Sequence, residues 1–112
     1  MIKGIDISQE QYDTLLALLH RHLPGVTVWA YGSRVKHTAR PNSDLDLVVF
    51  TTPAQRPQVS ELKDALDESN IPFRVDLHIW DEIPERFHNI ISQEYQILSD
   101  AALGVVPILF LG

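Results

Sequence analysis

A Gly-Ser pair and three aspartates form the group of residues in this sequence that is best suited to chemistry. Ten residues separate Gly32 and Ser33 from Asp44. Asp46 follows Asp44, and Asp76 lies further along in the segment RVDLHIW. Side chains two positions apart on a strand share a face, so Asp44 and Asp46 point the same way, roughly 6.5 to 7 Å apart. If the segment around Asp76 pairs with theirs, as sequential strands often do, three carboxylates converge on one open face.

Three carboxylates at close range need a cation. Like charges raise one another's pKa and destabilise the fold unless a counter-ion compensates them. Oxygen ligands in a chain without cysteine, with no histidine pair among them, suit Mg²⁺ or Mn²⁺ rather than zinc. Mg²⁺ usually binds one or two carboxylates together with phosphate oxygens of a substrate, and a pair of ions can activate an attacking oxygen while stabilising the leaving one. The aspartates therefore predict a metal-assisted reaction of a phosphate compound.

The Gly-Ser pair adds a second feature that points to phosphate. Gly32 at the end of a strand permits close approach of the backbone, and Ser33 with the amides that follow can donate hydrogen bonds to a phosphate. Arg34 and Lys36 lie next to the pair as cations. Taken singly, an Asp-x-Asp pair is often a solvated strand edge, and a Gly-Ser pair is usually a turn. The combination favours a phosphate and metal site.

Helical and strand patterns supply the elements that must position these residues. Ser8 and Gln11 resemble a capping box at the start of a first helix, which Pro24 and Gly25 end. We expect helices over residues 12–23, 59–70 and 83–98, and strands over residues 26–31, 45–50 and 73–80. In the last two strands, the residues that alternate with the acids are apolar and should face the helices: Leu45, Leu47, Val49, Val75, Leu77 and Ile79.

Composition restricts the class of protein. The chain has 112 residues, 45% hydrophobic and 21% charged, and we expect residues 1–112 to form a single domain. The sequence has no cysteine and no signal-like segment, so we expect a cytoplasmic protein without disulfides. The apolar segment 101–112 is short for a membrane span. A formal net charge of −6 argues against direct binding of nucleic acid.

The motif as a whole resembles the signature of the DNA polymerase β-like nucleotidyltransferase superfamily. The chain length is similar to that of the minimal nucleotidyltransferases, the MNT group, many of which are antitoxins of HEPN-domain toxins. The resemblance implies an α/β (α+β) fold in which a mixed sheet carries helices on one face and the active site on the other. It also implies that Asp44, Asp46 and Asp76 are catalytic residues and metal ligands. Two Mg²⁺ ions are the implied cofactor, with Mn²⁺ as an alternative.

The same resemblance implies a donor and its binding residues. Gly32, Ser33 and Arg34 would bind the triphosphate of ATP, and Asp76 would help to activate an acceptor hydroxyl. The implied function is a nucleotidyltransferase antitoxin that moves AMP from ATP to a tyrosine of its HEPN toxin, with which it would form a hetero-oligomer. Two alternatives stay open: an antitoxin that acts by binding alone, and nucleotidyl transfer to a small hydroxylated molecule. The Arg and His spacing of the HEPN nuclease signature is absent from the expected helices.

Several other residues have two interpretations each. Arg40 can touch phosphate or be a solvated loop residue, and His78 can contact substrate or lie at the rim of the site. Trp29 and Tyr31 can stack a base or pack within the sheet. Segment 105–112 can be an interface with a partner, a piece of the core or an artefact at the end of the chain. We assign no zinc to the remaining histidines, which are His20, His22, His37 and His88.

Overall fold

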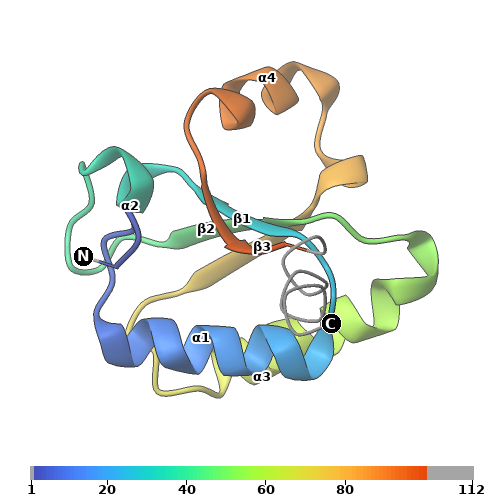
Figure 1. The fold of residues 1–112 in the computed structure, drawn as a ribbon, viewed down its shortest axis with the longest axis horizontal. Coiled ribbons are helices and arrows are strands. Elements are labelled where there is room, and N and C mark those ends of the chain that lie inside the picture. The colour runs from blue at the N-terminus through green and yellow to red at the C-terminus, as the bar shows by residue number, and fades with distance from the viewer. Residues whose placement is uncertain (1, 101–112) are drawn as a thin grey trace, which may run out of the picture.

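A mixed sheet is the frame of the structure (Figure 1). The computed structural model describes residues 2–100, and within this range four strands form one sheet. The strands are β1 (Val28–Tyr31), β2 (Leu45–Val49), β3 (Val75–Ile79) and β4 (Gln96–Ser99). Their order is β3-β2-β1-β4, with β2 parallel to β3, and β1 antiparallel to both β2 and β4. The predicted α/β fold with a mixed sheet is confirmed. The apolar segment 101–112 lies outside the described residues.

Helices lie on both sides of this sheet but cover it unequally. They are α1 (Gln9–His22), α2 (Ser33–Lys36), α3 (Arg56–Asp67) and α4 (Glu85–Gln93), with 3-10 turns η1 (Pro53–Gln55) and η2 (Trp80–Glu82). In Figure 1, α1 and α3 run side by side beneath the sheet, and α4 stands over the opposite face. None of the helices in the described range is long and apolar enough to cross a membrane.

The predicted capping box at the start of α1 is confirmed. The hydroxyl oxygen of Ser8 accepts a hydrogen bond from the Gln11 N–H at 3.1 Å, and the Gln11 side chain accepts one from the Ser8 N–H at 2.9 Å. Two amides that have no partner within the helix are thereby satisfied. A sequence signal of four residues thus fixes where the first helix begins.

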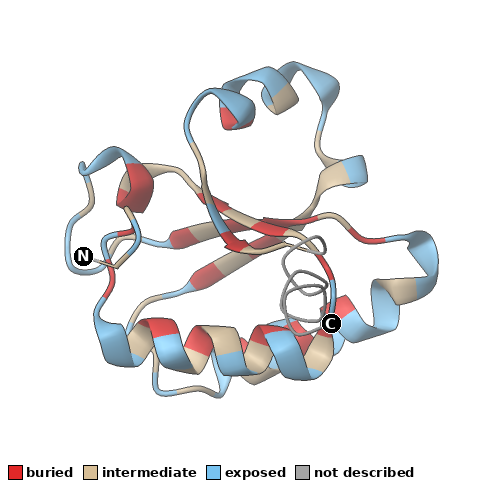
Figure 2. Ribbon diagram, viewed as in Figure 1, coloured by how far each residue is buried: buried red, intermediate tan, exposed pale blue. Residues whose placement is uncertain are grey.

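The main core lies between the sheet and helices α1 and α3. From β2, Leu45, Leu47 and Val49 are at most 1% exposed, and from β3, Val75 and Leu77 join the same cluster. Figure 2 shows the buried residues of α1 on the side that faces the sheet. The predicted division of these strands into an apolar face and an acidic face is therefore confirmed, and the acidic face is turned away from α1 and α3.

The predicted helix over residues 83–98 is wrong in its last part. The helix α4 ends at Gln93, because Glu94 adopts an extended backbone with φ −152° and ψ 102°. Leu98 instead belongs to β4, where its side chain is 7% exposed and packs in the core. The strand forms because β1 would otherwise leave one edge of hydrogen-bonding groups unpaired. A short apolar segment does not distinguish the end of a helix from an edge strand.

Arg34 joins three parts of the chain from a buried position. Its side chain is on α2, yet the residue is only 5% exposed. Its Nε and Nη2 donate hydrogen bonds to the carbonyl oxygen of Ser43, at 3.0 and 2.8 Å. Nη2 also donates to the carbonyl oxygen of Pro41 at 3.0 Å. Nη1 donates to the carbonyl oxygen of Asp6 at 2.8 Å. The guanidinium carbon lies 3.8 Å from the ring centroid of Phe73. Through these hydrogen bonds, Arg34 holds the N-terminal segment and the loop before Asp44 against α2.

Replacing Arg34 with lysine should destabilise the protein although the charge is kept. A lysine has one nitrogen and cannot donate to three separated carbonyl oxygens while stacking on a ring. We expect Arg34→Lys to lower the free energy of unfolding by about 3 kcal/mol, measured by urea denaturation. Arg40→Lys, in the exposed part of the same loop, is the matched control and should stay within about 0.5 kcal/mol of the native protein. Equal losses in the two variants would contradict this role for Arg34.

Candidate active site

Three neighbouring strands bring polar side chains into one row on the face opposite α1 and α3. Asp46 of β2 is the register partner of Asp76 on β3 and of Tyr31 on β1. All three residues are half-buried. The predicted pairing of the two acid-bearing strands is confirmed, and it is what places Asp76 beside Asp46. Asp44 directly precedes β2 and is exposed.

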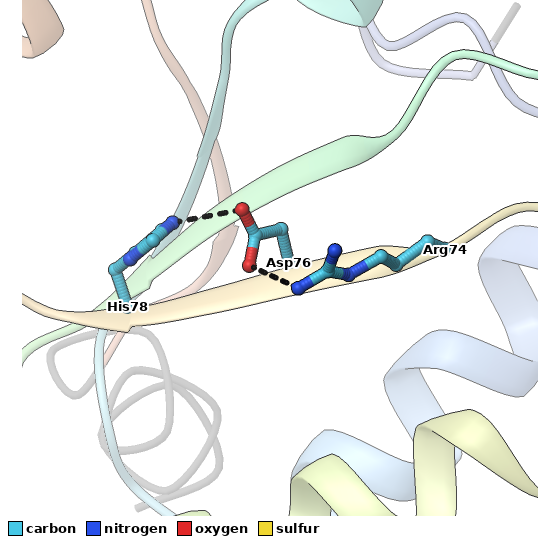
Figure 3. Close-up of polar contacts among 3 residues, drawn as sticks. All are labelled: Arg74, Asp76 and His78. Carbon is cyan, nitrogen blue, oxygen red and sulfur yellow. Dashed lines mark hydrogen bonds and ion pairs between the residues drawn. The ribbon is translucent and has the colours of Figure 1, made fainter.

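Two basic side chains flank Asp76: His78 of β3 and Arg74, which directly precedes that strand (Figure 3). Nε2 of His78 lies 3.1 Å from Oδ2 of Asp76, and Nη2 of Arg74 lies 3.6 Å from Oδ1. Each carboxylate oxygen of Asp76 therefore faces one basic group. The arginine side chain is 68% exposed, so water screens its ion pair and the contact adds little stability.

The electrostatics of the row favour a bound cation. Burial raises the pKa of Asp46, and the charges of Asp76 and Asp44 raise it further, while His78 acts in the opposite direction. Burial, followed by the charges of Asp46 and Asp76, raises the pKa of Tyr31 to about 12. Burial is the largest cause of both shifts, and the carboxylate charges that add to it show that negative charge is concentrated in this row.

The donor atoms at this place are suitable for a metal ion. One ligand atom from each of Asp46, Asp76 and His78 lies within 4.8 Å of the other two. Two adjacent carboxylates fit a hard divalent cation. The exposed Asp44 is not a member of this group, although its charge acts on Asp46.

Gly32 leaves space for the side chain of Asp46. Its φ of +82° lies in the region that favours glycine, and a Cβ built on it would collide with Oδ2 of Asp46. Its carbonyl oxygen accepts hydrogen bonds from the N–H groups of Val35 and Lys36, both at 3.0 Å, so it also begins α2. Ser33 follows as the half-buried first residue of that helix. The expected position of Gly32 at the end of a strand is confirmed, because β1 ends at Tyr31.

The structure places Arg34 differently from the other two members of the predicted nucleotide-binding set. Gly32 lines the cavity described below, and Ser33 is next to it, whereas the guanidinium of Arg34 is bound to backbone carbonyls inside the protein. The cation that reaches the cavity from α2 is Lys36. A helical turn at these positions would have indicated this difference between Arg34 and Lys36, because successive residues of such a turn point in different directions.

A cavity of about 430 Å³ lies beside the acids, between the sheet and α4. Tyr31, Gly32, Lys36 and His78 line one side of it, and the residues lining the other side are Glu82, Ile83, Pro84, Phe87, Ile90, Ile91 and Glu94. This volume is within the range of small-molecule sites. Sequence reasoning misses the second wall because the apolar spacing of α4 is also that of a core-facing helix. Phe87 and Ile90 are in fact 41% and 52% exposed.

Trp29 belongs to an aromatic cluster on the same face of the sheet. Its ring stacks on Tyr95 with centroids 3.8 Å apart and meets the edge of Phe50 at 4.6 Å. Trp80 in turn stacks on His88 at 3.9 Å. Of the two interpretations of Trp29, packing is the one that the structure supports, whereas Tyr31 of the same strand lines the cavity.

The contact between Gly32 and Asp46 predicts a large cost for a single methyl group. Gly32→Ala adds backbone strain and a clash, and we expect it to lower the free energy of unfolding by about 2 to 4 kcal/mol in chemical denaturation. Gly25→Ala is the matched control, since Gly25 has φ +71° but a Cβ added to it would have nothing within 4 Å. It should cost only about 1 kcal/mol of strain. Similar losses for both variants would contradict a steric role of Asp46.

The raised pKa of Asp46 predicts how stability changes with pH in the absence of metal. Folding favours the protonated carboxyl, so the free energy of unfolding falls as pH rises from the ordinary aspartate pKa through the raised one, and the penalty is complete above it. We expect Asp46→Asn to remove this fall and to raise the melting temperature by a few degrees near neutral pH. Thermal unfolding of both proteins with a chelator present, at several pH values, measures this change of stability with pH. Asp64→Asn, on the exposed surface of α3, should follow the native curve.

The chain is similar to known proteins along most of its length. A sequence profile of the family described as polymerase beta, nucleotidyltransferase matches residues 14–102. The probable protein adenylyltransferase MntA of Haemophilus influenzae is 38% identical over 97 residues, which cover 86% of this chain and 85% of that protein. The range that the profile matches includes the Gly-Ser pair and all three aspartates.

Solved structures with the same fold are more distant in sequence. A toxin-antitoxin crystal structure with AMP-PNP has a TM-score of 0.57 at 20% identity, covering 89% of this chain and 85% of that one. A complex of tri-AMPylated HEPN toxin from Shewanella oneidensis with its MNT antitoxin has a TM-score of 0.53 at 18% identity, covering 94% and 89%. At such identities the likeness concerns the fold alone. On the family profile and the MntA similarity, the chain belongs to the polymerase beta nucleotidyltransferase family.

Proposed function

We propose that this nucleotidyltransferase is the antitoxin of a HEPN-domain toxin, and that it transfers AMP from ATP to a tyrosine hydroxyl of that toxin. The observation that carries the proposal is the Asp46 and Asp76 pair, set beside Gly32 and a cavity of about 430 Å³. The relative named a protein adenylyltransferase supports the type of reaction and the donor. The solved complex of an AMPylated HEPN toxin with an MNT antitoxin supports the partner. The cytoplasm, where ATP is abundant, is the proposed location.

Asp44, Asp46 and Asp76 are the proposed ligands of two Mg²⁺ ions, or of Mn²⁺. The fit rests on the oxygen donors and on the neighbouring carboxylate charges, which add to burial in raising the pKa of Asp46. When bound, the ions would neutralise charge on the triphosphate and favour ionisation of the acceptor hydroxyl. Asp44 is exposed at the open end of the site, where it is accessible to an ion that arrives with the nucleotide.

The chain's own residues orient the reactants. The backbone at Gly32 and the hydroxyl of Ser33 donate hydrogen bonds to phosphate oxygens, and Lys36 adds a positive charge from the wall of the cavity. Asp76 accepts the proton of the tyrosine hydroxyl. The phenolic oxygen then bonds to the α-phosphorus as the bond to pyrophosphate breaks. The nucleoside occupies the cavity between the sheet and α4, where apolar side chains exclude water.

Removing the acidic charge should abolish transfer while leaving the fold intact. The variant Asp44→Asn/Asp46→Asn loses charged metal ligands, and metal assistance contributes several kcal/mol to a rate, so we expect transfer to fall by about a thousandfold. The measurement is the intact mass of the cognate toxin after incubation with the chain, Mg²⁺ and each nucleoside triphosphate in turn. The native chain should add AMP units only with ATP, and Asp64→Asn should match it.

Other outcomes of this assay point to the alternatives. Undiminished transfer by the doubly substituted variant would overturn the mechanism. A tight complex with the toxin and no mass gain from the native chain would favour an antitoxin that acts by binding alone. Consumption of nucleoside triphosphate only in the presence of a small hydroxylated compound would replace the protein acceptor with a small-molecule acceptor.

A further inference from the structure

His78 lies beside the two acids, and the proposed function gives it no role. It stands two positions after Asp76 on β3, so the two side chains leave the strand on the same face. Its side chain is 42% exposed and lines the cavity between the sheet and α4. The ring is therefore accessible to a group that binds between the acids and this cavity.

The distances among the three side chains match the donor spacing around one metal ion. Nε2 of His78 lies 3.1 Å from Oδ2 of Asp76, and ligand atoms of Asp46, Asp76 and His78 all lie within 4.8 Å of one another. In an octahedral site with bonds of about 2.1 Å, neighbouring ligands are about 3.0 Å apart and opposite ligands about 4.2 Å apart. Nε2 and Oδ2 thus have the separation of neighbouring ligands, and the separations from Asp46 to these groups do not exceed 4.8 Å.

We propose that His78 is a direct ligand of one metal ion, together with Asp46 and Asp76, and that it gives this site a preference for Mn²⁺ over Mg²⁺. The inference rests on the metal-dependent transfer proposed above. Mg²⁺ keeps to oxygen ligands, whereas divalent ions of the first transition row also accept an imidazole nitrogen. Mn²⁺ combines that tolerance with a preference for carboxylate and water. Two carboxylates and one imidazole therefore suit Mn²⁺ better than Mg²⁺.

The other contacts of Asp76 leave room for this ligand set. Arg74 approaches Oδ1 of Asp76, while His78 approaches Oδ2, so the two basic groups do not compete for one oxygen (Figure 3). Ligation through Nε2 puts the imidazole proton on Nδ1. In the metal-free protein, an Nε2–H donating to Oδ2 would hold the ring where the ion later needs it.

A purely orienting role for His78 would explain the same contact differently. A histidine that only donates to Asp76 would hold the carboxylate for any ion, so its loss would weaken Mg²⁺ and Mn²⁺ binding equally. A direct ligand instead changes the ratio of the two affinities. His78→Gln separates these roles because the amide N–H can still donate to Asp76, whereas the amide offers a metal ion only an oxygen.

The test measures metal binding rather than turnover. The whole chain is incubated with Mn²⁺ and α,β-methylene ATP. Electron paramagnetic resonance reports the amount of bound Mn²⁺ and any coupling of the ion to a coordinated nitrogen. The affinity for Mg²⁺ is measured by competition of Mg²⁺ with bound Mn²⁺. We expect nitrogen coupling in the native chain and its loss in His78→Gln. Mn²⁺ affinity should fall by about tenfold or more in that variant, and Mg²⁺ affinity should change by less than about threefold. His20→Gln, which removes an exposed imidazole of α1, should change neither.

Two results would overturn this proposal. One is a native Mn²⁺ complex without nitrogen coupling, and the other is an equal loss of both affinities in His78→Gln. The variant Asp46→Asn distinguishes failure of the His78 proposal from failure of the proposed function. If it abolishes Mn²⁺ binding while His78→Gln does not, the metal site stands and His78 is not a ligand. If neither variant affects binding, Asp46 is not a metal ligand either, and both the His78 ligation and the metal-dependent transfer as proposed are wrong.

Discussion

The close placement of Asp46 and Asp76 in neighbouring strands is the constraint that the rest of the structure must accommodate. Parallel pairing of β2 with β3 puts the two half-buried carboxylates side by side, and their repulsion adds to the burial that raises the pKa of Asp46. The opposite face of the same strands supplies the compensating free energy, since Leu47 and Leu77 are 0% and 3% exposed there. Each strand therefore contributes to the stability on one face and to the chemistry on the other.

The turn after β1 shows how the rest of the fold accommodates this pair. Gly32 lacks the Cβ that would strike Asp46, so α2 can begin directly beside the carboxylate. Two residues later, Arg34 fixes the loop that leads into Asp44 by donating to the carbonyl oxygens of Pro41 and Ser43. Two of the three residues in this Gly-Ser-Arg segment thus have a structural reason to be present, besides any contact with nucleotide.

The sequence predicts features with a local pattern and misses those created by distant contacts. Alternation along β2 and β3 distinguishes the apolar face from the acidic one, and neighbouring pairing then brings Asp76 to Asp46. Apolar spacing alone puts Leu98 in a helix, because its strand exists only through pairing with β1. The burial of Arg34 depends on Asp6, which is 28 residues away in sequence, so no spacing rule indicates it. The wall formed by α4 is a tertiary feature of the same kind.

The site also explains why stability and activity should oppose each other in this chain. A neutral residue at position 46 relieves repulsion and burial of charge, but it would remove a ligand from the proposed metal site. Arg74 compensates Asp76 only weakly, because its side chain is largely exposed and the ion pair is 3.6 Å long. On the function proposed above, ions that enter with the triphosphate would supply the missing positive charge. Nucleotide and metal should therefore stabilise the fold together more than either does alone, since each compensates the charge of the other.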